Sequence, residues 1–124
     1  MQLYSRLISF LNKLISPTED LIHLFNYYFF DLKYYLNPTA SEQNFAQQLN
    51  ISVEKLNLIS LHYYNNSFEL LLNEKRYQHF LKEMQNPLNA NLTVKSILHS
   101  CGFGNSSGFV TFINQRNKNL YASS

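Results

Sequence analysis

The chain has 124 residues, of which 45% are hydrophobic, and this is enough for one packed domain or two very small subdomains. Its single cysteine excludes an internal disulfide, and its four scattered histidines lack the spacing of a zinc site. The most apolar stretch, Leu21 to Phe30, is too short for a bilayer span of roughly 20 residues. We therefore expect no membrane partner, no metal and no cofactor. No secretory signal is recognisable, so we expect a cytoplasmic protein.

Helical periodicity dominates the sequence, and we expect an all-α fold. Apolar residues recur at helical spacing over 3–15 and predict an amphipathic helix ahead of the main domain. The next helix is predicted over 16–35, because Pro38 disfavours helix before it. We separate residues 1–20 from a domain at 21–124. The apolar face of the first segment is expected to form a homodimer or to connect to a sensory domain missing from this chain.

Two stretches, 41–65 and 93–116, share one pattern: a short helix, a residue able to adopt positive φ, a turn hydrophobe, a cap and a second helix. A long helix over 67–86 joins them. The turn residues are Asn50 and Ile51 in the first stretch and Gly102 and Phe103 in the second. The predicted caps are Ser41, Ser52, Ser67, Thr93 and Ser106. We expect two tandem helix-turn-helix subdomains, whose linking helix spaces two reading helices about one DNA turn, roughly 34 Å, apart.

The inward faces follow from the same periodicity. On the second helix of the first stretch we expect Leu56, Ile59 and Tyr63 to face the core. The long helix should turn Phe68, Leu71, Leu72, Tyr77, Phe80, Leu81 and Met84 inward. The last helix is predicted from a cap at Ser106 to about Gln115, with a fraying tail after it.

From about Phe30 onwards the chain resembles the AraC/XylS-type DNA-binding domain of transcription regulators. The stretches that carry the resemblance are Leu36-Asn37-Pro38, Phe45 to Ser52, Asn66 to Arg76, Leu92-Thr93-Val94 and Gly102 to Phe109. They stand in the family's order and cover roughly 90 residues. The resemblance implies a DNA-binding protein, and it implies that Arg76 organises the joint between the subdomains by hydrogen bonds. The sequence has no Gly-rich phosphate loop, no paired carboxylates at useful spacing and no metal cluster, so we do not expect an enzyme.

In a helix-turn-helix, the exposed N-terminal half of the second helix enters the major groove. In the first unit this predicts DNA contacts by Glu54, Lys55, Asn57, Leu58, Leu61 and His62. In the second unit it predicts Ser106, Ser107, Val110, Thr111 and Asn114, with Arg116 and Lys118 close to phosphates. Asparagine suits adenine and leucine suits the thymine methyl group, so we expect double-stranded, A·T-rich DNA.

Two functions remain open, because the charge distribution favours DNA binding while several residues differ from those typical of the family. Residues 84–124 hold three basic and no acidic side chains, so the small net charge of +2 is concentrated in the second unit. This favours DNA binding with weak phosphate anchoring. However, Leu58 and Thr111 stand where the family has arginine, and Asn114 stands where it has lysine. The alternative is therefore a protein-interaction module that keeps the fold and has lost DNA binding.

Overall fold

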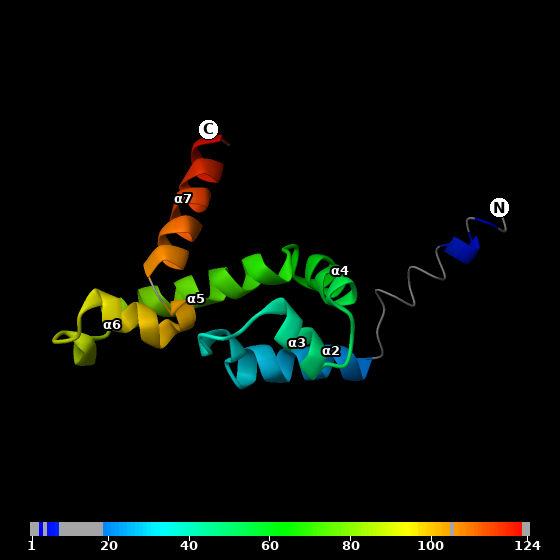
Figure 1. The fold of residues 1–124 in the computed structure, drawn as a ribbon, viewed down its shortest axis with the longest axis horizontal. Coiled ribbons are helices and arrows are strands. Elements are labelled where there is room, and N and C mark those ends of the chain that lie inside the picture. The colour runs from blue at the N-terminus through cyan, green and yellow to red at the C-terminus, as the bar shows by residue number, and fades with distance from the viewer. Residues whose placement is uncertain (1–2, 4, 8–18, 105, 123–124) are drawn as a thin grey trace. The chain divides into compact units, whose positions relative to one another are not determined.

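The computed structural model describes residues 3, 5–7, 19–104 and 106–122. These residues form helices and turns and contain no strand, which confirms the all-α fold class (Figure 1). The chain falls into two compact units. The first unit is Met1–Tyr34 with Ala40–Leu72, and the second unit is Tyr35–Thr39 with Asn73–Ser124.

From Glu19 onwards, the described part of the first unit contains three α-helices and the beginning of a fourth, connected by short turns. In chain order its elements are α2 (Glu19–Asn26), the π-helical turn η1 (Tyr27–Asp31), α3 (Glu42–Gln48), α4 (Val53–Tyr64) and the start of α5 (Phe68–Gln85). The 3₁₀ turn η2 (Tyr34–Leu36) opens the connection from η1 to α3. The core is mostly aromatic: the rings of Phe25 and Phe45 meet edge to face with centroids 5.1 Å apart, and Phe45 stacks on Phe68 at 5.0 Å. Such pairs add to the free energy of burying their area.

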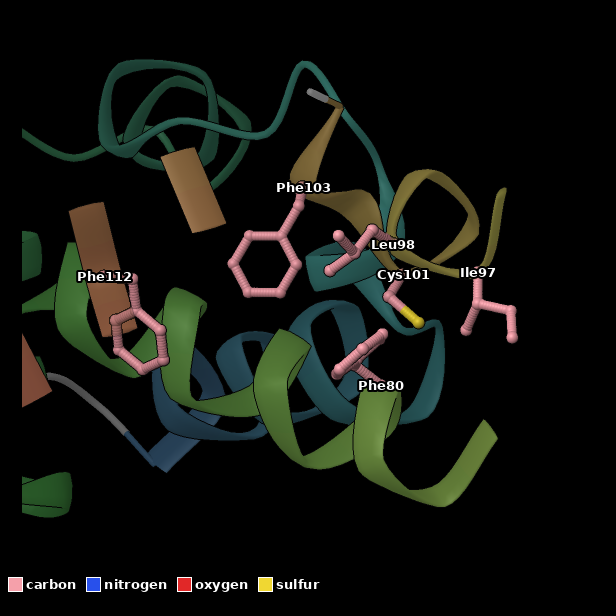
Figure 2. Close-up of a cluster of buried hydrophobic side chains, with 6 residues drawn as sticks. All are labelled: Phe80, Ile97, Leu98, Cys101, Phe103 and Phe112. Atoms are coloured by element: carbon pink, nitrogen blue, oxygen red, sulfur yellow. The ribbon is translucent and has the colours of Figure 1, made fainter. Parts of the chain in front are cut away.

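The second unit contains the rest of α5 and the helices that follow it. These are the 3₁₀ turn η3 (Pro87–Asn89), α6 (Val94–Leu98), the π-helical turn η4 (His99–Phe103) and α7 (Ser106–Ala122). Its core is built from side chains of α5, α6, η4 and α7. Figure 2 shows the Cys101 sulfur among the hydrocarbon side chains of this core. The buried members are Phe80, Ile97, Leu98, Cys101, Phe103 and Phe112.

Four of the five predicted serine and threonine caps accept the expected hydrogen bond, whereas the fifth, Ser106, is the first residue of α7. The hydroxyl of Ser41 accepts a hydrogen bond from the Asn44 N–H at 3.0 Å, and that of Ser52 accepts one from the Lys55 N–H at 3.1 Å. Ser67 and Thr93 cap α5 and α6 in the same way, accepting at 3.3 and 3.1 Å from the N–H groups three residues on. The predicted start of the helix over 16–35 lies outside the described residues. Each bond satisfies a helix-terminal donor that has no partner within the helix.

The predicted second helix ends earlier than expected. It passes into η1, whose last turn closes with a 2.8 Å bond from the Leu32 N–H to the Tyr27 carbonyl, and Lys33 then takes a positive φ of 55°. This turn allows the Tyr34 hydroxyl to accept from the Ser41 N–H at 3.2 Å. The helical stretch therefore ends at the positive φ of Lys33, ahead of Pro38.

Three predicted inward positions are wrong. Tyr63 on α4 and Leu81 and Met84 near the end of α5 are exposed. On α4 the buried positions are instead Leu56, Ile59 and Ser60. Helical periodicity predicts which way each side chain points, but it does not predict how far the neighbouring elements extend along the helix. Near the end of α5, the described residues leave Leu81 and Met84 exposed to solvent.

The C-terminal helix is longer than predicted, and the N-terminal segment lies mostly outside the described residues. The last helix does not end near Gln115, because α7 continues to Ala122. At the other end, residues 3 and 5–7 are helical, and Leu3 and Leu7 are exposed. The remainder of the predicted helix over 3–15 lies outside the described residues.

Candidate nucleic-acid interface

In the first unit, α3 and α4 are joined by a turn in which Asn50 has a φ of 58°, as predicted for a left-handed terminator. The Asn50 N–H donates to the Gln47 carbonyl at 3.1 Å, and the Ile51 N–H donates to the Ala46 carbonyl at 3.0 Å. This pair of bonds is the Schellman motif, which satisfies the last carbonyls of α3. Ser52 then caps α4, so two short helices leave the turn in different directions.

The corresponding turn of the second unit depends on Gly102, which has a φ of 94°. A Cβ at this position would lie 2.3 Å from the Tyr35 carbonyl oxygen and 2.8 Å from Nε of Arg76. Arg76 is buried, and it donates from Nε to the Tyr35 carbonyl at 2.7 Å and from Nη2 to the Asn37 carbonyl at 2.8 Å. Arg76 is therefore a structural residue, and all of these partners belong to the second unit itself.

Phe103 follows Gly102 and fills the angle between η4 and α7. Its ring is buried and lies 5.2 Å from the ring of Phe109 and 6.3 Å from that of Phe112. The turn hydrophobe predicted from the sequence therefore packs against the inward face of α7. This contact sets which side of α7 is left for a ligand.

The outward side of α7 carries a row of small polar side chains and one lysine. Successive residues of an α-helix are rotated by about 100°, so positions 107, 111, 114 and 118 fall within a sector of about 60°. All four side chains are exposed. We call this row the α7 stripe, and its members are Ser107, Thr111, Asn114 and Lys118. The exposed Val110 borders it, and the Thr111 hydroxyl donates to the Ser107 carbonyl at 3.0 Å.

Arg116, which we expected near DNA phosphates, has a partner within the second unit, and its contact with DNA stays a prediction. The residue lies on the inward side of α7, where its guanidinium pairs with the Glu74 carboxylate and lies 5.0 Å above the Tyr77 ring. A half-turn of the helix separates it from the α7 stripe. The sequence gives no direct signal for Glu74 as its partner, because the two residues stand 42 positions apart.

Asn57, which we expected to read adenine, has hydrogen-bond partners within the first unit, and its contact with DNA stays a prediction. Its Nδ2 donates to Glu42 Oε2 at 3.0 Å and to the Val53 carbonyl at 3.3 Å. Its Oδ1 accepts from the Phe68 N–H at 2.9 Å. Both ends of the amide are thus used within the first unit, linking α3, α4 and the start of α5.

The remaining predicted contacts of the first unit lie on the outward side of α4. Leu61 and His62 are exposed, whereas Leu58 and Lys55 are half-buried. Glu54 is also exposed in the first turn of the helix. The two candidate reading helices therefore differ chemically: α4 presents two leucines among mixed charges, and α7 presents hydroxyl, amide and ammonium groups. The side chain of Ser106 lies outside the described residues.

Within the described ranges, no helix is long and apolar enough to cross a membrane, and no group of His, Cys, Asp and Glu side chains is arranged to hold a metal ion. Cys101 is fully buried, and this burial raises the pKa of its thiol, which disfavours the nucleophilic thiolate. Comparison of the chain with protein-family models, with curated proteins and with solved structures finds no match.

Proposed function

We propose that this chain is a sequence-specific DNA-binding transcription regulator of the AraC/XylS type, or the DNA-binding part of one, that acts in the cytoplasm and is not an enzyme. In this proposal α4 and α7 each enter a segment of the major groove. The α7 stripe is the observation that supports it, because four exposed polar side chains lie in one row on α7, the helix that we propose as the second of a helix–turn–helix pair.

The chemistry of this stripe fits base edges. An asparagine can bind both N6 and N7 of adenine, and serine and threonine hydroxyls can either donate or accept. Lys118 extends the row at its C-terminal end and supplies a charge for a phosphate. Residues 84–124 contain no acidic side chain to repel the backbone. We therefore propose an A·T-rich duplex as the partner, held with few phosphate contacts and a shallow salt dependence.

A second candidate is a protein-interaction module with the same fold. The observation that favours it is the half exposure of Leu61 on α4 and Val110 on α7, 51% in both cases, on the outward sides of the two helices. Exposed apolar side chains on a candidate interface are also typical of protein docking sites. The two candidates differ in salt dependence, because only binding to a polyanion releases condensed counterions.

Selection from a pool of random duplexes at low salt, with the full chain as bait, tests the main proposal. We expect enrichment of an A·T-rich motif and an affinity for the enriched duplex that falls as salt is raised. The absence of enrichment, together with no competition by any duplex, would contradict DNA binding and leave the interaction module.

A pair of charge reversals makes this test specific to α7. Lys118→Glu reverses a charge on the α7 stripe and should weaken binding to the enriched duplex at least tenfold. Lys82→Glu reverses an exposed charge on α5 and changes the net charge by the same amount. Equal losses in the two variants would show a general charge effect and would argue against α7 as the binding helix.

A further inference from the structure

The outward side of α4 has an apolar centre. Leu58 and Leu61 lie one helical turn apart in the middle of the helix, and Glu54 continues their row towards its N-terminus. Leu61 is 51% exposed although it is a large hydrocarbon side chain. No residue of this row carries a hydrogen-bond donor in its side chain.

The Asn57 amide beside this row already makes three hydrogen bonds within the first unit. Asn57 uses its Nδ2 for Glu42 and the Val53 carbonyl, and its Oδ1 for the Phe68 N–H. Turning Asn57 outwards would leave the Phe68 N–H, at the start of α5, without that acceptor. A contact between Asn57 and adenine would therefore have to replace these hydrogen bonds, whereas Asn114 on α7 is exposed.

Hydrocarbon side chains in the major groove have one specific target, the methyl group on C5 of a pyrimidine. A carboxylate such as that of Glu54 adds only acceptors, which suit the exocyclic amino groups of cytosine and adenine. The two units of this chain thus offer different means of recognition. The α7 stripe presents hydrogen-bonding groups, and the row of Glu54, Leu58 and Leu61 on α4 presents two leucine side chains and a carboxylate.

We propose that the first unit recognises C5-methyl groups of the DNA major groove through Leu58 and Leu61, so that thymine or 5-methylcytosine is required in its part of the site. Binding then depends on methylation wherever cytosine occupies that position. The inference rests on the proposed DNA-binding function, and it adds a ligand chemistry that the α7 stripe does not need.

The test uses the full chain and the duplex enriched in the selection described above. Each thymine is replaced singly by deoxyuridine, which removes the methyl group and keeps every base-pairing group. We expect one or two positions at which affinity falls roughly fourfold per methyl group, the effect of one buried carbon. At those positions a 5-methylcytosine·guanine pair should bind roughly fourfold more tightly than cytosine·guanine.

Leu61→Ala connects the effect to α4. In this variant the thymine-to-deoxyuridine penalty and the preference for 5-methylcytosine should both disappear at the same positions. Leu24→Ala truncates another exposed helical leucine of the first unit and should keep both effects. Circular dichroism checks that each variant keeps the helical content of the parent chain.

The outcomes separate this inference from the function beneath it. If no duplex is enriched, both fail. If a duplex is enriched and deoxyuridine is tolerated at every position, or if the penalty persists unchanged in Leu61→Ala, then methyl recognition by α4 is wrong while DNA binding by the chain stands.

Discussion

The side-chain oxygen of Asn57, in the middle of α4, accepts a 2.9 Å hydrogen bond from the backbone N–H of Phe68, the first residue of α5. Asn57 therefore acts as a second cap for α5 from a distance of eleven residues, in addition to the local cap at Ser67. The same amide reaches Glu42 on α3. A single side chain thus connects three helices of the first unit.

This relationship predicts that Asn57 contributes to stability and Asn114 to binding. Asn57→Ala leaves the Phe68 N–H and the Glu42 carboxylate without this partner, and it should lower the free energy of unfolding by about 1–2 kcal/mol. Asn114→Ala removes an exposed amide and should change stability by less than about 0.5 kcal/mol. Urea denaturation measures both. If Asn57→Ala is neutral, the three bonds do not hold the unit together.

At Gly102 we predict that even a methyl group is not tolerated. Gly102→Ala must strain a backbone with φ of 94° and place its Cβ 2.3 Å from the Tyr35 carbonyl oxygen, so a loss of at least about 2 kcal/mol is expected. Gly108→Ala is the matched control. Gly108 lies in α7, and a Cβ at this position would be 4.0 Å from the Phe103 carbonyl oxygen, which is an ordinary contact distance. It should gain about 0.5–1 kcal/mol. Similar thermal midpoints for the two variants would contradict the close approach.

The helix caps, the turns and the packing of Phe103 were predictable from the sequence, whereas the long-range partners of several polar side chains were not. Caps such as Ser41 and Ser52 and the positive φ of Asn50 and Gly102 depend on a few neighbouring residues, so the sequence is sufficient to place them. By contrast, the internal partners of Asn57 and Arg116 come from residues far along the chain. Polar residues that a helical wheel places on the outside are therefore the hardest interface residues to predict, because their side chains can form hydrogen bonds or ion pairs with other helices.

Ser60 is the one fully buried side chain within the described residues whose hydroxyl has no hydrogen-bond partner. An unpaired buried hydroxyl costs about 1–3 kcal/mol, and alanine is the better helix former. We therefore expect Ser60→Ala to raise the free energy of unfolding by about 1 kcal/mol. Ser52→Ala is the control, because it removes the cap of α4 and should lower stability by about 1 kcal/mol. A destabilised Ser60→Ala would mean that the hydroxyl does have a partner in solution.

Because Cys101 is buried, we expect the free energy of unfolding of the second unit to fall at alkaline pH. Burial raises the pKa of its thiol above the ordinary value of 9.0, so the native state holds the proton more tightly than the unfolded chain. This contribution is fully present below pH 9 and is lost as pH rises from there through the native pKa. Denaturation curves between pH 7 and roughly pH 10 should show this decline. The decline should be smaller in Cys101→Ala, and an identical decline in that variant would assign it to other groups.

The most direct test of DNA binding by α7 is a residue-resolved titration of the ¹⁵N-labelled chain with the enriched duplex. We expect the largest amide shift changes at the α7 stripe, Ser107, Thr111, Asn114 and Lys118, and small changes at the inward residues Phe112 and Arg116. Shift changes that leave the stripe untouched, or no change with any duplex, would contradict the proposal that this helix reads DNA.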